Sequence, residues 1–253
     1  MRTQDVPARH GWLWIKQGVS LFKKAPLPWL TMSMLWSLLL AITILVLWPL
    51  GAFVVVVLYP LLVAIWLRGC QQVDETGDLK ISETFTGLRP QLGSLLALGI
   101  LIVFAQTTIS FFASKLVPLD PELIKLVAKY PDFTPEDAEA AAPSLLTFTI
   151  VQLIASIPIF LASWFAPPLI VFRGMKIWHA IRWSVYASIS NIGALSLYGL
   201  ACAIPLLIAG GLPGMLSAPI TLVLTPIFFA TIYAGYRDIF IDTPEPIAEE
   251  VEE

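Results

Sequence analysis

The sequence predicts an all-α integral membrane protein with six transmembrane helices, and three observations support this fold class. Hydrophobic residues make up 57% of the 253-residue chain, charged residues make up only 13%, and the mean hydropathy is +0.81. Several apolar runs reach the roughly 20 residues that a helix needs to cross a bilayer. The sequence lacks the short alternating segments typical of an outer-membrane barrel. Lipid can cover this much apolar surface, whereas a soluble fold of this length could not.

The chain divides into three parts. Residues 1–26 are expected to form a cytoplasmic arm with an interfacial amphipathic helix, residues 27–240 a membrane domain, and residues 241–253 a disordered acidic cytoplasmic tail. The apolar windows predict spans over 27–48, 50–67, 94–117, 144–172, 191–210 and 213–236. Proline and glycine in 48–51 and 210–214 predict tight turns, so the flanking spans should form hairpins. A helical periplasmic loop is expected over 118–143, with a helix start at Thr134-Pro-Glu-Asp137.

Basic residues predict the orientation of the spans. Twelve of the fifteen lysines and arginines lie on the side of the two termini, and three lie in or beside the 118–143 loop. Cytoplasmic segments carry the excess of lysine and arginine. Both termini are therefore expected in the cytoplasm of a bacterial inner membrane.

The six spans are predicted to form three pseudo-repeated units, each a cytoplasmic interfacial amphipathic helix followed by a helical hairpin. An aromatic residue lies four or five positions before a helix-breaking or capping residue in each unit: Phe22 before Pro26, Phe85 before Pro90, and Tyr186 before Asn191. Each hairpin then ends in an arginine: Arg68, Arg173 or Arg237. A repeat accounts structurally for residues that would otherwise suggest a binding site.

The third amphipathic segment, 173–190, combines basic and aromatic residues in a way that favours the surface of a membrane. Its apolar residues should share one helical face, with Lys176, His179, Arg182 and Trp183 around the other side. Such helices lie in the headgroup plane of an anionic leaflet, which is the partner expected here, whereas nucleic acid is not. The predicted membrane-surface anchors are Trp12, Trp14, Lys23, Lys24, Lys176, Trp178, Arg182 and Trp183.

The residues 14–22 (WIKQGVSLF), the repeated helix-plus-hairpin plan and the residues 233–240 (YAGYRDIF) resemble one group of proteins. These are uncharacterised bacterial six-helix inner-membrane proteins, distantly similar to the membrane domain associated with glycerophosphodiester phosphodiesterases. The resemblance covers about residues 10–240. It implies a location and an architecture, and it implies no catalytic or binding residues.

The sequence argues against enzymatic and ion-coupled roles. All eighteen acidic residues fall outside the predicted spans, whereas ion-coupled pumps usually need an ionisable group within the membrane. No phosphate-binding loop, zinc-protease, nucleophile-elbow or Cys-x-x-Cys motif occurs. The two histidines and two cysteines lie far apart in the chain. We therefore expect no enzyme activity, catalytic residue, cofactor or metal ligand.

Neutral polar residues in the third and fourth spans form the candidate site. Gln106 and Gln152 should lie at nearly the same depth on consecutive antiparallel helices, about 18–20 Å from the cytoplasmic side. An amide facing lipid would lose its hydrogen bonds. We expect both side chains to point inward and to bond each other or to share Ser110 and Ser156. The cluster could hold neighbouring helices together or line a solute path.

The favoured function is a non-enzymatic scaffold, or a partner of other membrane or envelope components. The alternative is a carrier or channel for a neutral or lipid-like solute, and an enzyme acting on lipids is the least favoured. A continuous polar cavity between the third and sixth spans would favour the carrier, and a filled bundle would favour the scaffold.

Overall fold

The protein is built from helices, with no strand in the part that the computed structural model describes, residues 3–47, 50–116 and 134–240. Within these ranges, six helices are long and apolar enough to cross a membrane. In chain order they are α2 (Pro26–Val46), α3 (Gly51–Thr76), α5 (Leu92–Leu116), α7 (Pro135–Trp164), α10 (Ile192–Gly211) and α11 (Gly214–Ile239). The predicted fold class, an all-α multi-pass membrane protein, is confirmed.

Shorter helices connect the spanning ones. They are α1 (His10–Lys24), α4 (Ile81–Thr86), a 3-10 turn (Arg89–Gln91), α8 (Ala166–Arg173) and α9 (Ile177–Ser190). Helices α1, α4 and α9 each precede a spanning pair, at the three places where the sequence predicts amphipathic helices. The repeat relationship among the three units remains a prediction.

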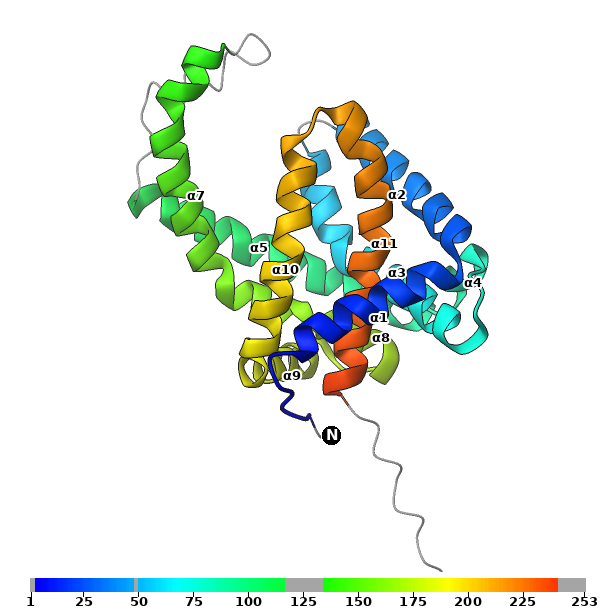
Figure 1. Ribbon diagram of the computed structural model, residues 1–253. Coiled ribbons are helices and arrows are strands. Elements are labelled where there is room, and N and C mark those ends of the chain that lie inside the picture. The colour runs from blue at the N-terminus through cyan, green and yellow to red at the C-terminus, as the bar shows by residue number, and fades with distance from the viewer. Residues whose placement is uncertain (1–2, 48–49, 117–133, 241–253) are drawn as a thin grey trace, which may run out of the picture.

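The spanning helices fall into two groups (Figure 1). Helices α2, α3, α10 and α11 contact one another in a bundle, and α1 crosses the front of α11 at a steep angle. Helix α5 packs against α3, and α7 packs against α5 and leans away from α10 toward its own N-terminal end. We call the antiparallel pair of α5 and α7 the hairpin.

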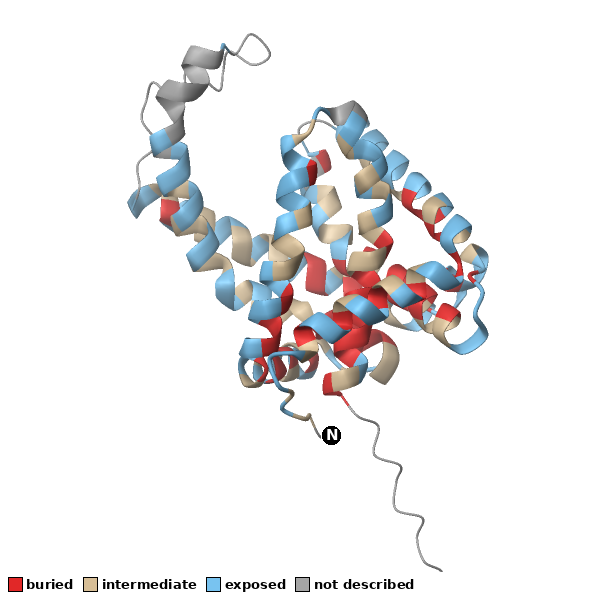
Figure 2. Ribbon diagram, in the orientation of Figure 1, coloured by how far each residue is buried: buried red, intermediate tan, exposed pale blue. Residues whose placement is uncertain are grey.

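Most buried residues gather at one end of the bundle (Figure 2). We call this the basic end, where α1, α8 and α9 lie and where α3 and α11 finish. The Trp66 ring stacks between two others, with ring centroids 5.7 Å from Trp29 and 5.0 Å from Phe229. These contacts join α2, α3 and α11. Both described chain ends lie here, because the Gln4 backbone N–H donates to the Ile239 carbonyl at 3.0 Å.

Helix α1 packs against protein along a narrow stripe. Gly11, Trp14, Gly18 and Leu21 are buried, spaced at three or four residues so that they share one face. A Cβ atom on Gly11 would lie 2.3 Å from the Ala194 carbonyl oxygen, and one on Gly18 would lie 2.5 Å from a Thr231 side-chain carbon. The two glycines therefore allow α1 to approach α10 and α11 closely.

Two predicted spans differ from the observed helices. The span predicted over 50–67 continues as α3 to Thr76, because the next helix-ending residue is Gly77, which takes the left-handed conformation at φ 77°. The span predicted over 144–172 coincides with the candidate span Leu145–Arg173, but this stretch is divided into two helices, because α7 ends at Trp164 and α8 follows from Ala166.

Part of the predicted 118–143 loop belongs to α7, which begins at Pro135 directly after Thr134, as the sequence predicts. The rest of this loop (residues 118–133), the last residue of the span predicted over 94–117, the turn residues 48–49 and the predicted tail 241–253 lie outside the described residues.

The break between α7 and α8 is held by α9. Pro167 and Pro168 lack the backbone N–H groups that would continue the helix. The Ser184 hydroxyl of α9 donates to the Leu161 carbonyl at 2.7 Å and accepts from the Phe165 N–H at 2.9 Å. A side chain therefore stands between a donor and acceptor four residues apart, which is a recognised cause of helix kinks.

Candidate functional site

The four residues of the predicted intramembrane cluster lie together between α5 and α7. The Gln106 amide donates to the Ser156 hydroxyl at 3.0 Å, and the Gln152 amide donates to the Ser110 hydroxyl at 2.9 Å. The Ser156 hydroxyl also donates to the Gln152 backbone carbonyl at 2.7 Å. Each glutamine is thus paired with a serine of the opposite helix. This is the second of the two predicted arrangements, since no bond joins the two amides among the described contacts.

The cluster joins the two helices of the hairpin and involves no other helix in the described hydrogen bonds. Interhelical hydrogen bonds of this kind stabilise contacts between membrane helices by about 0.6–2 kcal/mol. The Gln152 side-chain oxygen is buried and has no hydrogen-bond partner in the described part of the chain. The arrangement is suited to holding α5 against α7.

Most of the predicted membrane-surface anchors are exposed at the basic end. Trp12 is 51% exposed and Trp178 is 72% exposed. Trp183 is half-buried and meets Tyr186 edge to face at 5.8 Å between ring centroids. The remaining exposed anchors are the basic residues Lys23, Lys24, Lys176 and Arg182. Their role at a membrane surface remains a prediction.

Trp14 corrects one of these predictions. Its side chain is only 2% exposed, and its indole N–H donates to the Asp238 carboxylate at 2.7 Å. The residue belongs to the buried stripe of α1 and cannot contact headgroups. Tryptophan is favoured both at membrane interfaces and in packed cores with a hydrogen-bond acceptor, so its residue type alone does not distinguish the two.

Helix α9 also packs differently from the prediction. Its buried residues are small: Ala180, Ser184, Ala187 and Ser188. The apolar Ile189 is 57% exposed. Phe85 of α4 is 52% exposed, whereas Leu88, just beyond that helix, is buried. Small side chains allow α9 to lie close to α7 and α8, so protein contact decides which face is covered.

Asp238, near the end of α11, binds the N-terminal segment of the chain. Its carboxylate accepts from the Trp14 indole and lies 2.8 Å from His10 Nδ1. Its backbone carbonyl accepts a bond from the Gln4 side-chain amide. Nearby, the Asn191 side chain accepts from the Val6 backbone N–H at 2.8 Å and donates to the Gln4 carbonyl at 3.2 Å. The first and last described segments are therefore held together.

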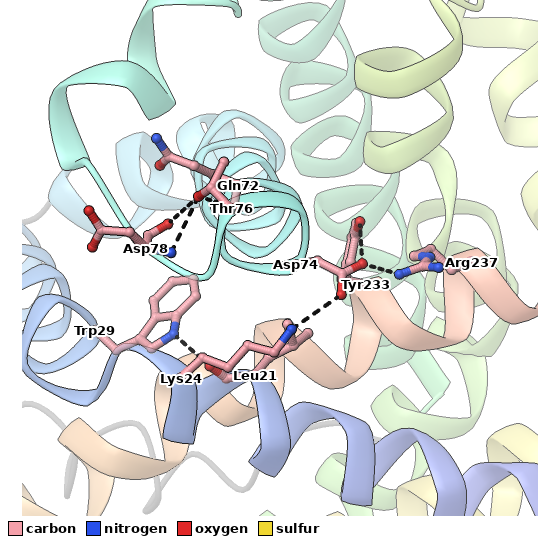
Figure 3. A network of polar contacts seen from close by, with 9 residues as sticks. All are labelled: Leu21, Lys24, Trp29, Gln72, Asp74, Thr76, Asp78, Tyr233 and Arg237. Carbon is pink, nitrogen blue, oxygen red and sulfur yellow. Dashed lines mark hydrogen bonds and ion pairs between the residues drawn. The ribbon is translucent and has the colours of Figure 1, made fainter.

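Asp74, near the end of α3, provides a second polar centre at the basic end (Figure 3). Its carboxylate forms an ion pair with Arg237 of α11 and lies 3.8 Å from the Lys24 ammonium of α1. The Tyr233 hydroxyl donates to the same carboxylate at 3.4 Å. One carboxylate thus links three helices that are distant in the sequence.

The sequence did not reveal these two carboxylates as structural centres. In the sequence, Asp74 and Asp238 are simply two of the acidic residues outside the predicted spans. For Asp74 one signal was available: glycine and proline are absent from 70–76, which indicates that α3 continues beyond residue 67. Asn191, predicted as a cap, binds the N-terminal segment with its side chain and caps no helix N–H. Within the described residues, no group of three or more His, Cys, Asp or Glu could hold a metal ion.

Three features define the class of this protein: six apolar spanning helices, no strand in the described residues, and polar centres near the helix ends. It is a multi-pass helical membrane protein. The chain is similar to a probable inner membrane protein of Burkholderia thailandensis, with 26% identity over 264 residues that cover 95% of this chain and 94% of that protein. No family model matches, and no solved structure matches. The protein is thus a multi-pass inner-membrane protein, and the comparisons give no link to the membrane domain associated with glycerophosphodiester phosphodiesterases.

Proposed function

We propose that the protein is a non-enzymatic scaffold that binds another integral membrane protein through the hairpin. The observation that carries this proposal is the uneven burial of the spans. Half of the most apolar stretch of α3 is buried inside the protein, compared with none of the corresponding stretch in the span Leu145–Arg173, which contains most of α7. Membrane helices associate through van der Waals packing and polar contacts between helices. Of the six candidate spans, the one that contains most of α7 has the smallest buried share, and the span that contains α5 is, like α2, only 17% buried.

The partner is best matched by a transmembrane helix with small side chains. Phe104 of α5 and Leu153 of α7 are 71% and 65% exposed, and they would insert between small residues of a facing helix. Thr107 and Thr149 are also exposed, and their hydroxyls make no hydrogen bond to the described residues. Threonine hydroxyls are common contacts between membrane helices. A surface with large apolar and small polar side chains favours a protein partner.

The alternative function, a carrier of a neutral or lipid-like solute, needs polar groups that face a path. The amide groups of Gln106 and Gln152 instead donate to Ser156 and Ser110 within the hairpin. Both amide groups therefore donate across the contact of α5 with α7. This pairing favours a structural role for the cluster.

We also propose that the basic end faces the cytoplasm. Exposed residues on α1, on α9 and directly before α9 would there contact an anionic leaflet: Trp12, Lys176, Trp178 and Arg182. A reporter active only in the periplasm should be inactive when fused after Glu253 and active when inserted near Asp132. The reverse pattern would overturn this orientation.

Copurification in mild detergent tests the scaffold role. The double variant Leu146→Ala/Leu153→Ala alters the hairpin, where these side chains are 62% and 65% exposed. The control Leu200→Ala/Leu207→Ala alters α10, where they are 71% and 75% exposed. A specific integral membrane protein should be enriched with the wild type and the control and depleted with the hairpin variant. Equal enrichment with all three forms would contradict the proposal.

A further inference from the structure

A cavity of about 620 Å³ opens at the basic end between the last turns of α3, α8 and α11. Arg68, Arg173 and Arg237, the three arginines that end the predicted hairpins, all line it. They are distant in the sequence and come from three different helices. Arginine is the side chain best suited to bind carboxylate and phosphate, because its planar group presents several N–H donors. The convergence of all three on one cavity indicates a site for an anion.

Three aromatic rings form the wall against which these arginines lie. The Phe172 ring centroid is 5.3 Å from that of Tyr236 and 6.0 Å from that of Tyr233. The guanidinium carbon of Arg68 lies 5.6 Å from the Phe172 centroid. Stacking on a ring uses the face of a guanidinium and leaves its N–H edge available to a ligand.

The other two arginines are positioned by the tyrosines. The Arg173 Nε donates to the Tyr236 hydroxyl at 3.2 Å, and the guanidinium carbon of Arg237 lies 5.9 Å from the Tyr233 ring centroid. Each of the three arginines therefore contacts a different ring of one aromatic cluster. Side chains fixed in this way lose little conformational entropy when they bind a ligand.

The carboxylates in the cavity wall, Asp74 and Glu75, already have partners, and two of these partners, Arg237 and Gln71, line the cavity as well. Asp74 binds Arg237 and Lys24, and Glu75 accepts from the Gln71 amide at 2.9 Å. In the described part of the chain, Arg68 has no carboxylate within ion-pair distance, and its Nη1 donates to the neutral Gln71 oxygen at 3.3 Å. Its Nε is buried without a hydrogen-bond partner there. A buried charged donor without an acceptor is costly, and a ligand in the cavity would reach this guanidinium through its other nitrogens.

We propose that this cavity binds a phosphate group, with Arg68 as its central contact. A guanidinium binds phosphate with two parallel hydrogen bonds, and the cavity volume falls within the roughly 300–1,000 Å³ of small-molecule sites. The site lies at the ends of spanning helices, where a lipid headgroup and a soluble phosphate ester offer the same chemistry. The proposal is independent of the surface of the hairpin, since no residue of α5 or α7 lines this cavity.

Two matched pairs of probes separate the two sources of phosphate. The purified full-length protein is mixed in detergent with phosphatidylglycerol or with diacylglycerol, which lacks the phosphate, and bound lipid is counted by native mass spectrometry. Glycerol 3-phosphate is compared with glycerol by the shift in melting temperature. Selective lipid binding identifies a headgroup site, and a shift with glycerol 3-phosphate alone identifies a soluble ligand. Absence of selectivity in both pairs would overturn the proposal.

Variants then test the role of Arg68. Arg68→Gln should weaken the selective binding roughly tenfold or more, because a hydrogen-bonded charge contact is lost. The control Arg89→Gln removes an equal charge from an exposed position at the predicted cytoplasmic side and should bind as the wild type does. Equal losses in both variants would mean that only overall charge matters and would overturn the site. If Arg68→Gln does not accumulate as a folded protein, the selectivity of the wild type between the paired probes decides.

Discussion

Helix α3, which finishes at the basic end, and the span containing α7 of the hairpin have the same hydropathy but opposite packing. The most apolar windows of α3 and of the span containing α7 have the same mean hydropathy, 2.2, yet half of the first is buried and none of the second. Hydropathy reports whether lipid can solvate a helix, and it does not report how much protein surrounds that helix. Packing therefore has to be determined from contacts.

The polar contacts of the two regions differ in the same way. Asp238 joins residues up to 234 positions away in the sequence, because its backbone carbonyl binds Gln4. The glutamines of the hairpin bind serines on the adjacent span only. The described side-chain bonds of the basic end thus join distant parts of the chain, whereas those of the cluster stay within the hairpin, whose helix α5 also packs against α3. Loss of a contact should cost stability in the first region and much less in the second.

The largest expected difference between the regions concerns aromatic truncation. Phe229→Ala removes a 6% exposed ring stacked on Trp66 and should lower the free energy of unfolding by about 3 kcal/mol or more. Phe104→Ala removes a 71% exposed ring on the hairpin and should change it by less than about 0.5 kcal/mol. Melting of both variants in the same detergent measures the difference. Similar losses would show that the hairpin is part of the stabilising core.

The next effect concerns the Asp238 carboxylate. Asp238→Ala leaves the buried Trp14 N–H without its acceptor, which should cost about 1–3 kcal/mol. Glu83→Ala is the control, because Glu83 pairs with Lys80 at 3.2 Å where both side chains are mostly exposed, and such pairs contribute about 0–1 kcal/mol. Faster proteolysis of the N-terminal arm should accompany the loss in Asp238→Ala. An arm that is as resistant as in the wild type would contradict the assigned contact.

A smaller effect is expected at the break between α7 and α8. Ser184→Ala removes the hydroxyl that bonds both Leu161 and Phe165, and it should cost about 1 kcal/mol. Ser114→Ala is the matched control in the hairpin, since that hydroxyl only bonds the Phe111 carbonyl in its own helix. Chemical denaturation of the two variants compares them directly. A larger loss in Ser114→Ala would reverse the expected order.

The smallest effect should come from the intramembrane cluster. Gln152→Leu removes one interhelical bond to Ser110 and should cost about 0.6 kcal/mol, the average for such bonds. Thr149→Val changes an exposed position one turn away and serves as the control. Normal folding of Gln152→Leu combined with complete loss of a cellular phenotype would instead support a solute path through the cluster.

The depth of a residue in the membrane and the periodicity of a helix could be derived from the sequence, whereas tertiary partners could not. The Gln106 and Gln152 pairing followed from counting residues along two spans, because lipid gives a polar side chain no other acceptor. Trp14 was misassigned because its acceptor, Asp238, is 224 residues away. Pro167 and Pro168 weaken the helix there, but the break at Phe165 also depends on Ser184 from another helix. A hydrogen-bond partner could therefore be predicted from the sequence only where one partner was possible.

The cavity with three arginines illustrates the same limit. The repeated arginine at the end of each predicted hairpin was visible in the sequence, but its convergence required the packing of α3, α8 and α11. Asp238 had no sequence signal beyond its position, and Asp74 had only the continuation of α3, because each is defined by the helices that it joins.

Photo-crosslinking in cells can show whether the hairpin, and not α10, forms the contact surface for a protein partner. A photoreactive phenylalanine analogue is placed at Phe104 or at Leu200, which are both 71% exposed. We expect a discrete adduct with one integral membrane protein from position 104, and only lipid adducts from position 200. Protein adducts from position 200 with none from position 104 would contradict this expectation, as would lipid adducts alone at both positions.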